Sequence, residues 1–101
     1  MAITSEEGKY SLETQGTSVR LKPLKEGGLN FKRAIPTSIL EATLAGDSKT
    51  VNGPAAGIFA TFSREDDKLQ VTLRFPDKPT ELVNFPADDV ELELMMLAEQ
   101  Q

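Results

Sequence analysis

Residues 58–75 read IFATFSREDDKLQVTLRF, and this stretch carries the clearest pattern in the chain. Apolar residues alternate with polar or small ones on both sides of a charged tip at residues 63–68. The residues expected on the buried side are Ile58, Ala60, Phe62, Leu69, Val71, Leu73 and Phe75. A period of two is typical of strands with one buried and one solvated face, so the stretch predicts a β-hairpin.

A second hairpin is predicted upstream, with strands near residues 9–15 and 18–23 and a turn at Gly16. Alternation over residues 29–35 predicts a third strand. After Pro36, which suits the first turn of a helix, the apolar spacing changes to that of a helix. We expect this short helix near residues 37–45, with Gly46 as its C-cap.

The remaining segments give weaker signals. Residues 1–8 are polar and are predicted to be a flexible lead, and residues 47–57 are predicted to be a mobile loop. A short strand is expected over residues 80–85. Helix formers favour a C-terminal helix over residues 93–99, and residues 90–92 fit a strand or a helix. No internal repeat is evident.

These elements predict an α+β fold for a single small domain at residues 9–101. Its sheet is mainly antiparallel or a partly open barrel of five to six strands, with one short middle helix and a C-terminal helix. The predicted core residues are Leu12, Val19, Leu21, Phe31, Ile35, Ile39, Leu40, Leu44, Ile58, Phe62, Leu69, Val71, Leu73, Phe75, Leu82 and Phe85.

The composition removes the most common catalytic groups. The chain of 101 residues has no cysteine and no histidine, so it lacks thiol nucleophiles, thiolate metal sites and the usual general base. No apolar run approaches the roughly 20 residues of a membrane span, and the first residues do not resemble a signal peptide. A cytoplasmic protein is therefore expected.

The polar pairs that remain have structural interpretations. Ser48 and Lys49 lie in the predicted loop without an oxyanion site nearby. The acidic pair at residues 66–67 lies at a hairpin tip, and the pair at residues 88–89 is placed to cap a helix. We therefore predict no catalytic, cofactor-binding or metal-binding residues, and we expect that the protein is not an enzyme.

A basic segment offers a nucleic-acid hypothesis. Basic residues beside an aromatic side chain suit single-stranded nucleic acid, although the net charge of −5 opposes attraction to phosphate. The candidate contacts are Arg20, Lys22, Lys25, Phe31, Lys32 and Arg33. Residues 33–40, with the Gly-Asp pair at 46–47, also resemble the swapped-hairpin transition regulators and antitoxins of the AbrB and MazE kind. That resemblance implies a small DNA-binding regulator.

The C-terminal segment offers the favoured hypothesis. Methionine-rich apolar surfaces beside acids often contact other proteins. The candidate contacts for self-association or for a partner are Leu92, Leu94, Met95, Met96 and Leu97. The same apolar cluster equally fits an ordinary buried core. The sequence therefore predicts a non-catalytic protein-interaction or regulatory module, expected to be a homo-oligomer, and the alternative is a nucleic-acid-binding regulator that uses residues 20–33.

Overall fold

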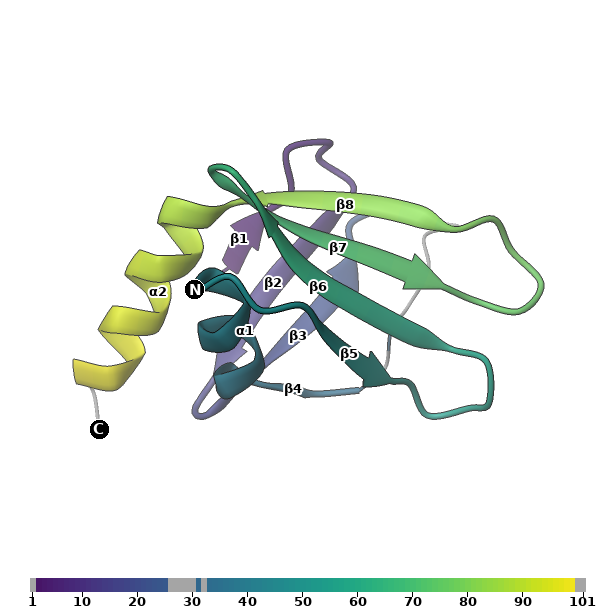
Figure 1. The fold of residues 1–101 in the computed structure, drawn as a ribbon, viewed down its shortest axis with the longest axis horizontal. Coiled ribbons are helices and arrows are strands. Elements are labelled where there is room, and N and C mark those ends of the chain that lie inside the picture. Colours follow the sequence, from purple (N-terminus) through teal and green to yellow (C-terminus); the bar gives the residue numbers. More distant parts are fainter. Residues whose placement is uncertain (1, 26–30, 32, 100–101) are drawn as a thin grey trace.

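The computed structural model describes residues 2–25, 31 and 33–99, and it confirms the predicted α+β class. Two four-stranded antiparallel sheets pack together with two helices, and neither sheet closes into a barrel (Figure 1). The first sheet contains β1 (Ala2–Thr4), β2 (Tyr10–Gln15), β3 (Ser18–Pro23) and β4 (Ile35–Pro36). The second contains β5 (Lys49–Asn52), β6 (Phe59–Glu65), β7 (Lys68–Arg74) and β8 (Glu81–Pro86). Helix α1 (Thr37–Leu44) follows the first sheet, and α2 (Ala87–Glu99) follows the second.

One continuous core lies between the two sheets. Its fully buried side chains come from both, including Leu12 and Leu21 of the first sheet and Phe62 and Phe85 of the second. The side-chain hydroxyl of Tyr10 also donates a hydrogen bond to the carboxylate of Glu81, which ties β2 to β8. Because neither sheet buries its apolar face alone, the two sheets stabilise each other.

One predicted core residue is wrong. Leu82 is 56% exposed, whereas its neighbour Val83 is 1% exposed. Successive side chains in a strand point to opposite faces, and Phe85 at 0% exposure sets the inward face of β8. Val83 shares that face with Phe85, so Leu82 must point outward.

The two halves of the chain repeat the same strand pairing. Leu12 pairs with Leu21 in the first sheet, and Phe62 pairs with Val71 in the second, 50 positions further along. The next pair of strands shows the same offset, because Val19 pairs with Ile35 and Leu69 pairs with Phe85. The structure therefore contains a repeat of strand pairing that is not evident in the sequence.

The backbone hydrogen bond at the start of each helix repeats as well. The amide of Thr37 donates to the carbonyl of Thr17 at 3.0 Å, and the amide of Ala87 donates to the carbonyl of Asp67 at 2.9 Å. In the sequence, the only trace of this repeat near the helices is a proline, a glutamate and a leucine at the same offset. These residues are Pro36, Glu41 and Leu44 in the first half, and Pro86, Glu91 and Leu94 in the second.

Each helix contacts the strands of the other half. Helix α1 packs against β6, and Nη1 of Arg64 donates to the carbonyl oxygen of Leu44 at 2.9 Å. In return, the hydroxyl of Thr14 in β2 donates to a carboxylate oxygen of Glu93 in α2 at 3.0 Å. The halves are therefore interlocked, although α2 also contacts β7 and β8 of its own half.

Several predicted elements differ from the structure. Residues 2–4 form β1 instead of a lead outside the sheet, and residues 49–52 form β5 instead of a mobile loop. Of the third strand predicted at 29–35, only the end appears, as β4, and residues 29–30 lie outside the described residues. Residues 90–92 are helical, because α2 begins at Ala87. Both short edge strands gain their hydrogen bonds from a neighbouring hairpin rather than from local sequence.

Candidate functional site: the helical end

Helix α2 exposes an apolar ridge. Leu92 is 57% exposed, Met95 is 61% exposed and Met96 is 36% exposed. Residues spaced by three and four positions share one face of a helix, so these three side chains form a single ridge. The opposite face of α2 enters the core through Val90 and Leu94, which are buried. The term apolar ridge refers below to Leu92, Met95 and Met96.

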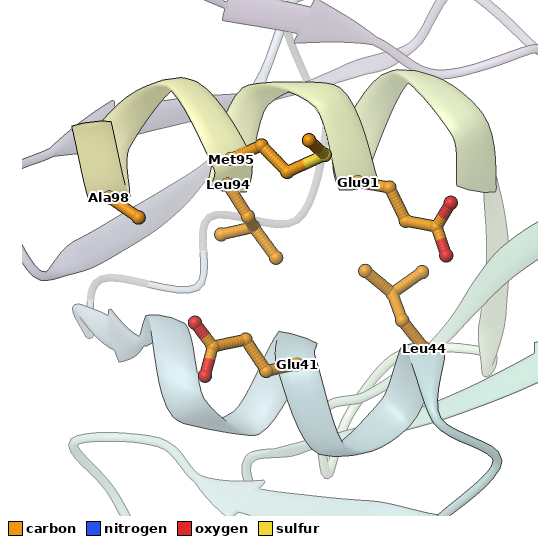
Figure 2. A pocket seen from close by; sticks show the side chains of 6 residues that line it. All are labelled: Glu41, Leu44, Glu91, Leu94, Met95 and Ala98. Atoms are coloured by element: carbon orange, nitrogen blue, oxygen red, sulfur yellow. The ribbon is translucent and has the colours of Figure 1, made fainter.

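A groove of about 490 Å³ lies between α1 and α2 on one side of the ridge. Figure 2 shows the two helices facing each other across it, with apolar side chains between them. Its lining residues are Glu41, Leu44, Glu91, Leu94, Met95 and Ala98. The groove is therefore apolar along its length, with one carboxylate from each helix.

Arg64 joins the two helices at one end of this groove. Its Nη1 donates to the carbonyl of Leu44 and lies 3.2 Å from Oε1 of Glu91. Its Nε donates to the carbonyl of Asp66 at 3.0 Å, which holds the guanidinium in place. Arg64 thus neutralises the carboxylate of Glu91, whereas no ion pair to Glu41 is found within the described part of the chain.

A second groove, of about 410 Å³, lies on the other side of the ridge, between β1 and α2. Ile3 and the ridge residues Leu92 and Met96 line it, together with the carboxylates of Asp89 and Glu93. Glu93 is only 7% exposed, and Thr14 donates a hydrogen bond to it. The ridge therefore stands between two apolar grooves, each with acidic side chains at its edge.

The helices carry the negative charge of the protein. Helix α2 contains five acids and no basic residue, and the only charged residue of α1 is Glu41. The rest of the chain holds all 11 basic residues and the other 10 of the 16 acids. The whole negative excess thus lies on α1 and α2, which together form the helical end.

The predicted C-terminal contact residues divide into two groups. Leu92, Met95 and Met96 lie on the surface, as a contact role requires. Leu94 is 8% exposed and Leu97 packs against the core, so these two leucines hold α2 on the body of the protein. Leu44 and Glu41 of α1 were not among the predicted contacts, because nothing local in the sequence places α1 beside α2.

The predicted nucleic-acid contacts do not form one stripe. Arg20, Lys22 and Lys25 are exposed on or beside β3, where Nζ of Lys22 pairs with Glu13 at 2.9 Å. Phe31 is 1% exposed and belongs to the core, so its predicted place beside these bases on the surface is wrong. Arg33 donates to the carbonyl of Asn52 at 3.0 Å, near the second sheet. Lys32 lies outside the described residues.

The polar pairs considered for chemistry occupy exposed positions. Ser48 and Lys49 are exposed, Asp66 and Asp67 form the tip of the β6–β7 hairpin, and the acids at 88–89 lie in the first turn of α2. Among the described residues, no three acids lie close enough together to hold a metal ion.

Two carboxylates at the β1–β2 loop contact the second sheet. The amide and the side chain of Asn84 donate to the carboxylate of Glu7 at 3.1 and 2.9 Å. Burial opposes ionisation of Glu7, but these hydrogen bonds outweigh it and lower its pKa. Nearby, the hydrogen bond to Glu6 raises the pKa of Lys68. Both groups lie outside the two grooves.

No family model matches the chain, and no curated protein or solved structure is similar enough to it to count as a match. The resemblance to regulators of the AbrB and MazE kind therefore gains no support from these comparisons. None of the helices in the described ranges is long and apolar enough to cross a membrane.

Proposed function

We propose that this protein is a non-catalytic interaction module that binds other proteins through its helical end. The observation that carries the proposal is the apolar ridge on a helix with five acids and no base, flanked by two grooves. Isolated exposed apolar residues are ordinary on protein surfaces, but three on one helix face beside apolar grooves form a continuous patch.

The energetics favour a contact at this ridge. Burying one exposed leucine or methionine side chain contributes roughly 1.5–3 kcal/mol. Leu92 and Met95 are both more than half exposed, so a partner that covers them gains most of that amount from each. Methionine is unbranched and adapts to differently shaped partners, which suits a binding surface. The body of the protein needs neither side chain for its own core.

Site-specific photo-crosslinking tests this proposal. A photoreactive phenylalanine analogue at Met95 is expected to give discrete covalent adducts in extract from the native cells. The same analogue at Asp77, which is exposed in the β7–β8 connection and outside both candidate surfaces, is the control and is expected to give none. Unlabelled wild-type protein should compete with the adducts, whereas the double variant Leu92→Glu, Met95→Glu should not.

Adducts at Asp77 but not at Met95 would contradict the proposal. Adducts at Met95 that the unlabelled double variant suppresses as well as unlabelled wild type does would contradict it too. An adduct of twice the mass of the chain identifies a second copy as the partner. That result would favour the self-association predicted from the sequence. The acids on α2 oppose that pairing, because two such helices would bring like charges together.

A second candidate function rests on the outer face of the second sheet. Phe59 and Arg74 are cross-strand neighbours there, with Cζ of Arg74 5.9 Å from the ring centroid. The face continues with hydroxyl and amide side chains such as Thr61 and Gln70. An aromatic ring with an arginine and amides is the kind of surface that stacks and hydrogen-bonds unpaired bases. It suits single-stranded nucleic acid better than the predicted segment 20–33 does.

A salt titration with fluorescent single-stranded oligonucleotides separates the two functions. If nucleic acid binds here, its affinity falls steeply with salt concentration. Arg74→Ala then weakens the binding more than Arg20→Ala, a control in the first sheet. No salt-dependent binding below about 0.1 M salt would exclude this second candidate.

A further inference from the structure

We infer that the groove between α1 and α2 binds a basic amphipathic helix of a partner protein. This inference rests on the proposed function and specifies the chemistry of the partner. It combines three features of the groove, which are its apolar lining, the position of Glu41, which has no ion pair within the described ranges, and the position of Arg64 at one end.

The apolar lining sets the first requirement. Leu44 lies on one wall and Leu94 and Met95 on the other, so the groove offers hydrocarbon surface on both sides (Figure 2). A groove between two helices accepts the apolar face of a third helix, whose anchor residues recur at spacings of three and four. An extended strand has no partner here, because both walls are helical and their backbone groups are already hydrogen-bonded.

The charges set the second requirement. Glu41 is exposed at the groove and has no ion-pair partner among the described residues. Three acids of α2 line the two grooves beside the ridge, namely Asp89, Glu91 and Glu93, and within the described part of the chain Glu91 is the one of these that pairs with an arginine. A helix with lysine or arginine beside its apolar anchors complements these charges, whereas an acidic helix is repelled. The same argument disfavours a second copy that presents its own α2.

The position of Arg64 sets the orientation of the partner helix in the groove. Arg64 bridges Leu44 and Glu91 at one end of the groove, and Figure 2 shows Glu41 and Ala98 towards the other end. This end of the groove already holds the guanidinium of Arg64, so it does not attract a second cation. The partner helix therefore lies with its basic residues towards Glu41.

The test uses a defined probe, a fluorescent helical peptide composed only of leucine and lysine in an amphipathic pattern. Fluorescence anisotropy with the full chain at about 0.1 M salt is expected to show saturable binding. A leucine–glutamate peptide with the same pattern, and a leucine–lysine peptide with a scrambled pattern, are expected to bind at least about tenfold more weakly because each lacks one requirement.

Matched variants locate the binding. Glu41→Lys replaces an attraction with a repulsion and is expected to weaken binding about tenfold. Asp77→Lys makes the same change of charge in the β7–β8 connection, which lies at the opposite end of the molecule from α2 (Figure 1). This control is expected to change the affinity for the peptide by less than about threefold. Met95→Ser should weaken binding, and Leu82→Ser, an equally exposed apolar position on the sheet, should not.

Equal effects of Glu41→Lys and Asp77→Lys would overturn the inference, because they would show attraction to net charge alone. Absence of peptide binding would overturn it as well. In either case the photo-crosslinking experiment at Met95 in cell extract tests the proposed function separately. If they persist, the surface binds a partner of different chemistry, and if they are also absent, both proposals fail.

Discussion

The two halves of the molecule share the pairing of three strands, and one place where they differ is the length of the helix that follows. Strands β2, β3 and β4 of the first half pair in the same register as β6, β7 and β8 of the second half. By the same offset, Leu44 of α1 corresponds to Leu94 of α2. Helix α1 ends at Leu44, whereas α2 continues through residues 95–99. The exposed methionines lie in that extension, so the part without a counterpart carries two of the three residues of the apolar ridge.

The physical reason for the difference lies at one position. Gly46 adopts a φ of 110°, and its amide donates to the carbonyl of Thr43, which ends α1 and turns the chain towards β5. The corresponding residue of the second half is Met96, a good helix former that continues α2. A shared fold therefore leads to a turn in one half and to an exposed helix in the other.

The largest expected effect tests whether the halves are one folding unit. Phe62→Ala removes a fully buried ring from the second sheet and should lower the free energy of unfolding by about 3–5 kcal/mol. Leu12→Ala, at the corresponding position of the first sheet, should lower it by about 2–5 kcal/mol. Urea unfolding followed by circular dichroism should show one transition in each variant. Two separate transitions would show that each half has its own core.

The next effect concerns the buried acid of α2. Glu93→Ala removes the carboxylate that accepts from Thr14 and should cost about 1–3 kcal/mol of stability. Glu93→Gln retains an oxygen that can accept this bond and should cost less. Chemical denaturation of both variants measures the difference. If the two substitutions cost the same, the Thr14–Glu93 contact does not hold α2 on the first half.

A smaller effect is expected at the turn that distinguishes the halves. Gly46→Ala forces a residue with a Cβ into a positive φ and should destabilise the protein by about 1 kcal/mol or more. Met96→Ala, at the corresponding position of α2, is helical and partly exposed, so it should change stability by less than about 0.5 kcal/mol. Thermal unfolding compares them, and equal effects would contradict the role assigned to Gly46.

The smallest effect is dependent on pH. Because the pKa of Glu7 is lowered in the folded state, its stabilising contribution is present above its ordinary pKa of 4.5 and is lost as the pH falls through the lowered value. Glu7→Gln should therefore reduce stability at pH 7 by less than about 1 kcal/mol, since the group is largely exposed. Unfolding measured from pH 7 to pH 3 should show the two proteins converging. A difference in the free energy of unfolding that stays constant over this pH range would show that the ionisation of Glu7 does not contribute to stability.

The strong local patterns predicted much of the fold. The alternation over residues 58–75 indicated β6 and β7, the turn at Gly16 indicated β2 and β3, and Pro36 marked the start of α1. Each of these signals arises from residues close in sequence. A period of two or a proline at a helix start suffices to recognise such an element.

Other features depend on contacts between distant residues, so the sequence did not show them. Strands β1 and β5 are short edges that exist because β2 and β6 pair with them. The repeat is encoded in the registers and in only a few shared residues, such as Pro36 and Pro86. For the candidate site, the sequence indicated the ridge on α2 but not the α1 wall of the groove, because α1 and α2 meet only in the tertiary fold.

The central claim is that binding is confined to the helical end, where the repeat is broken. An amide chemical-shift map of the isotopically labelled full chain, recorded with and without the leucine–lysine peptide, tests it most directly. We expect the largest shifts in residues 37–44 and 87–99, with little change in the β2–β3 and β6–β7 hairpins away from Arg64. Shifts centred on the outer faces of the sheets, or spread evenly over both halves, would contradict the claim.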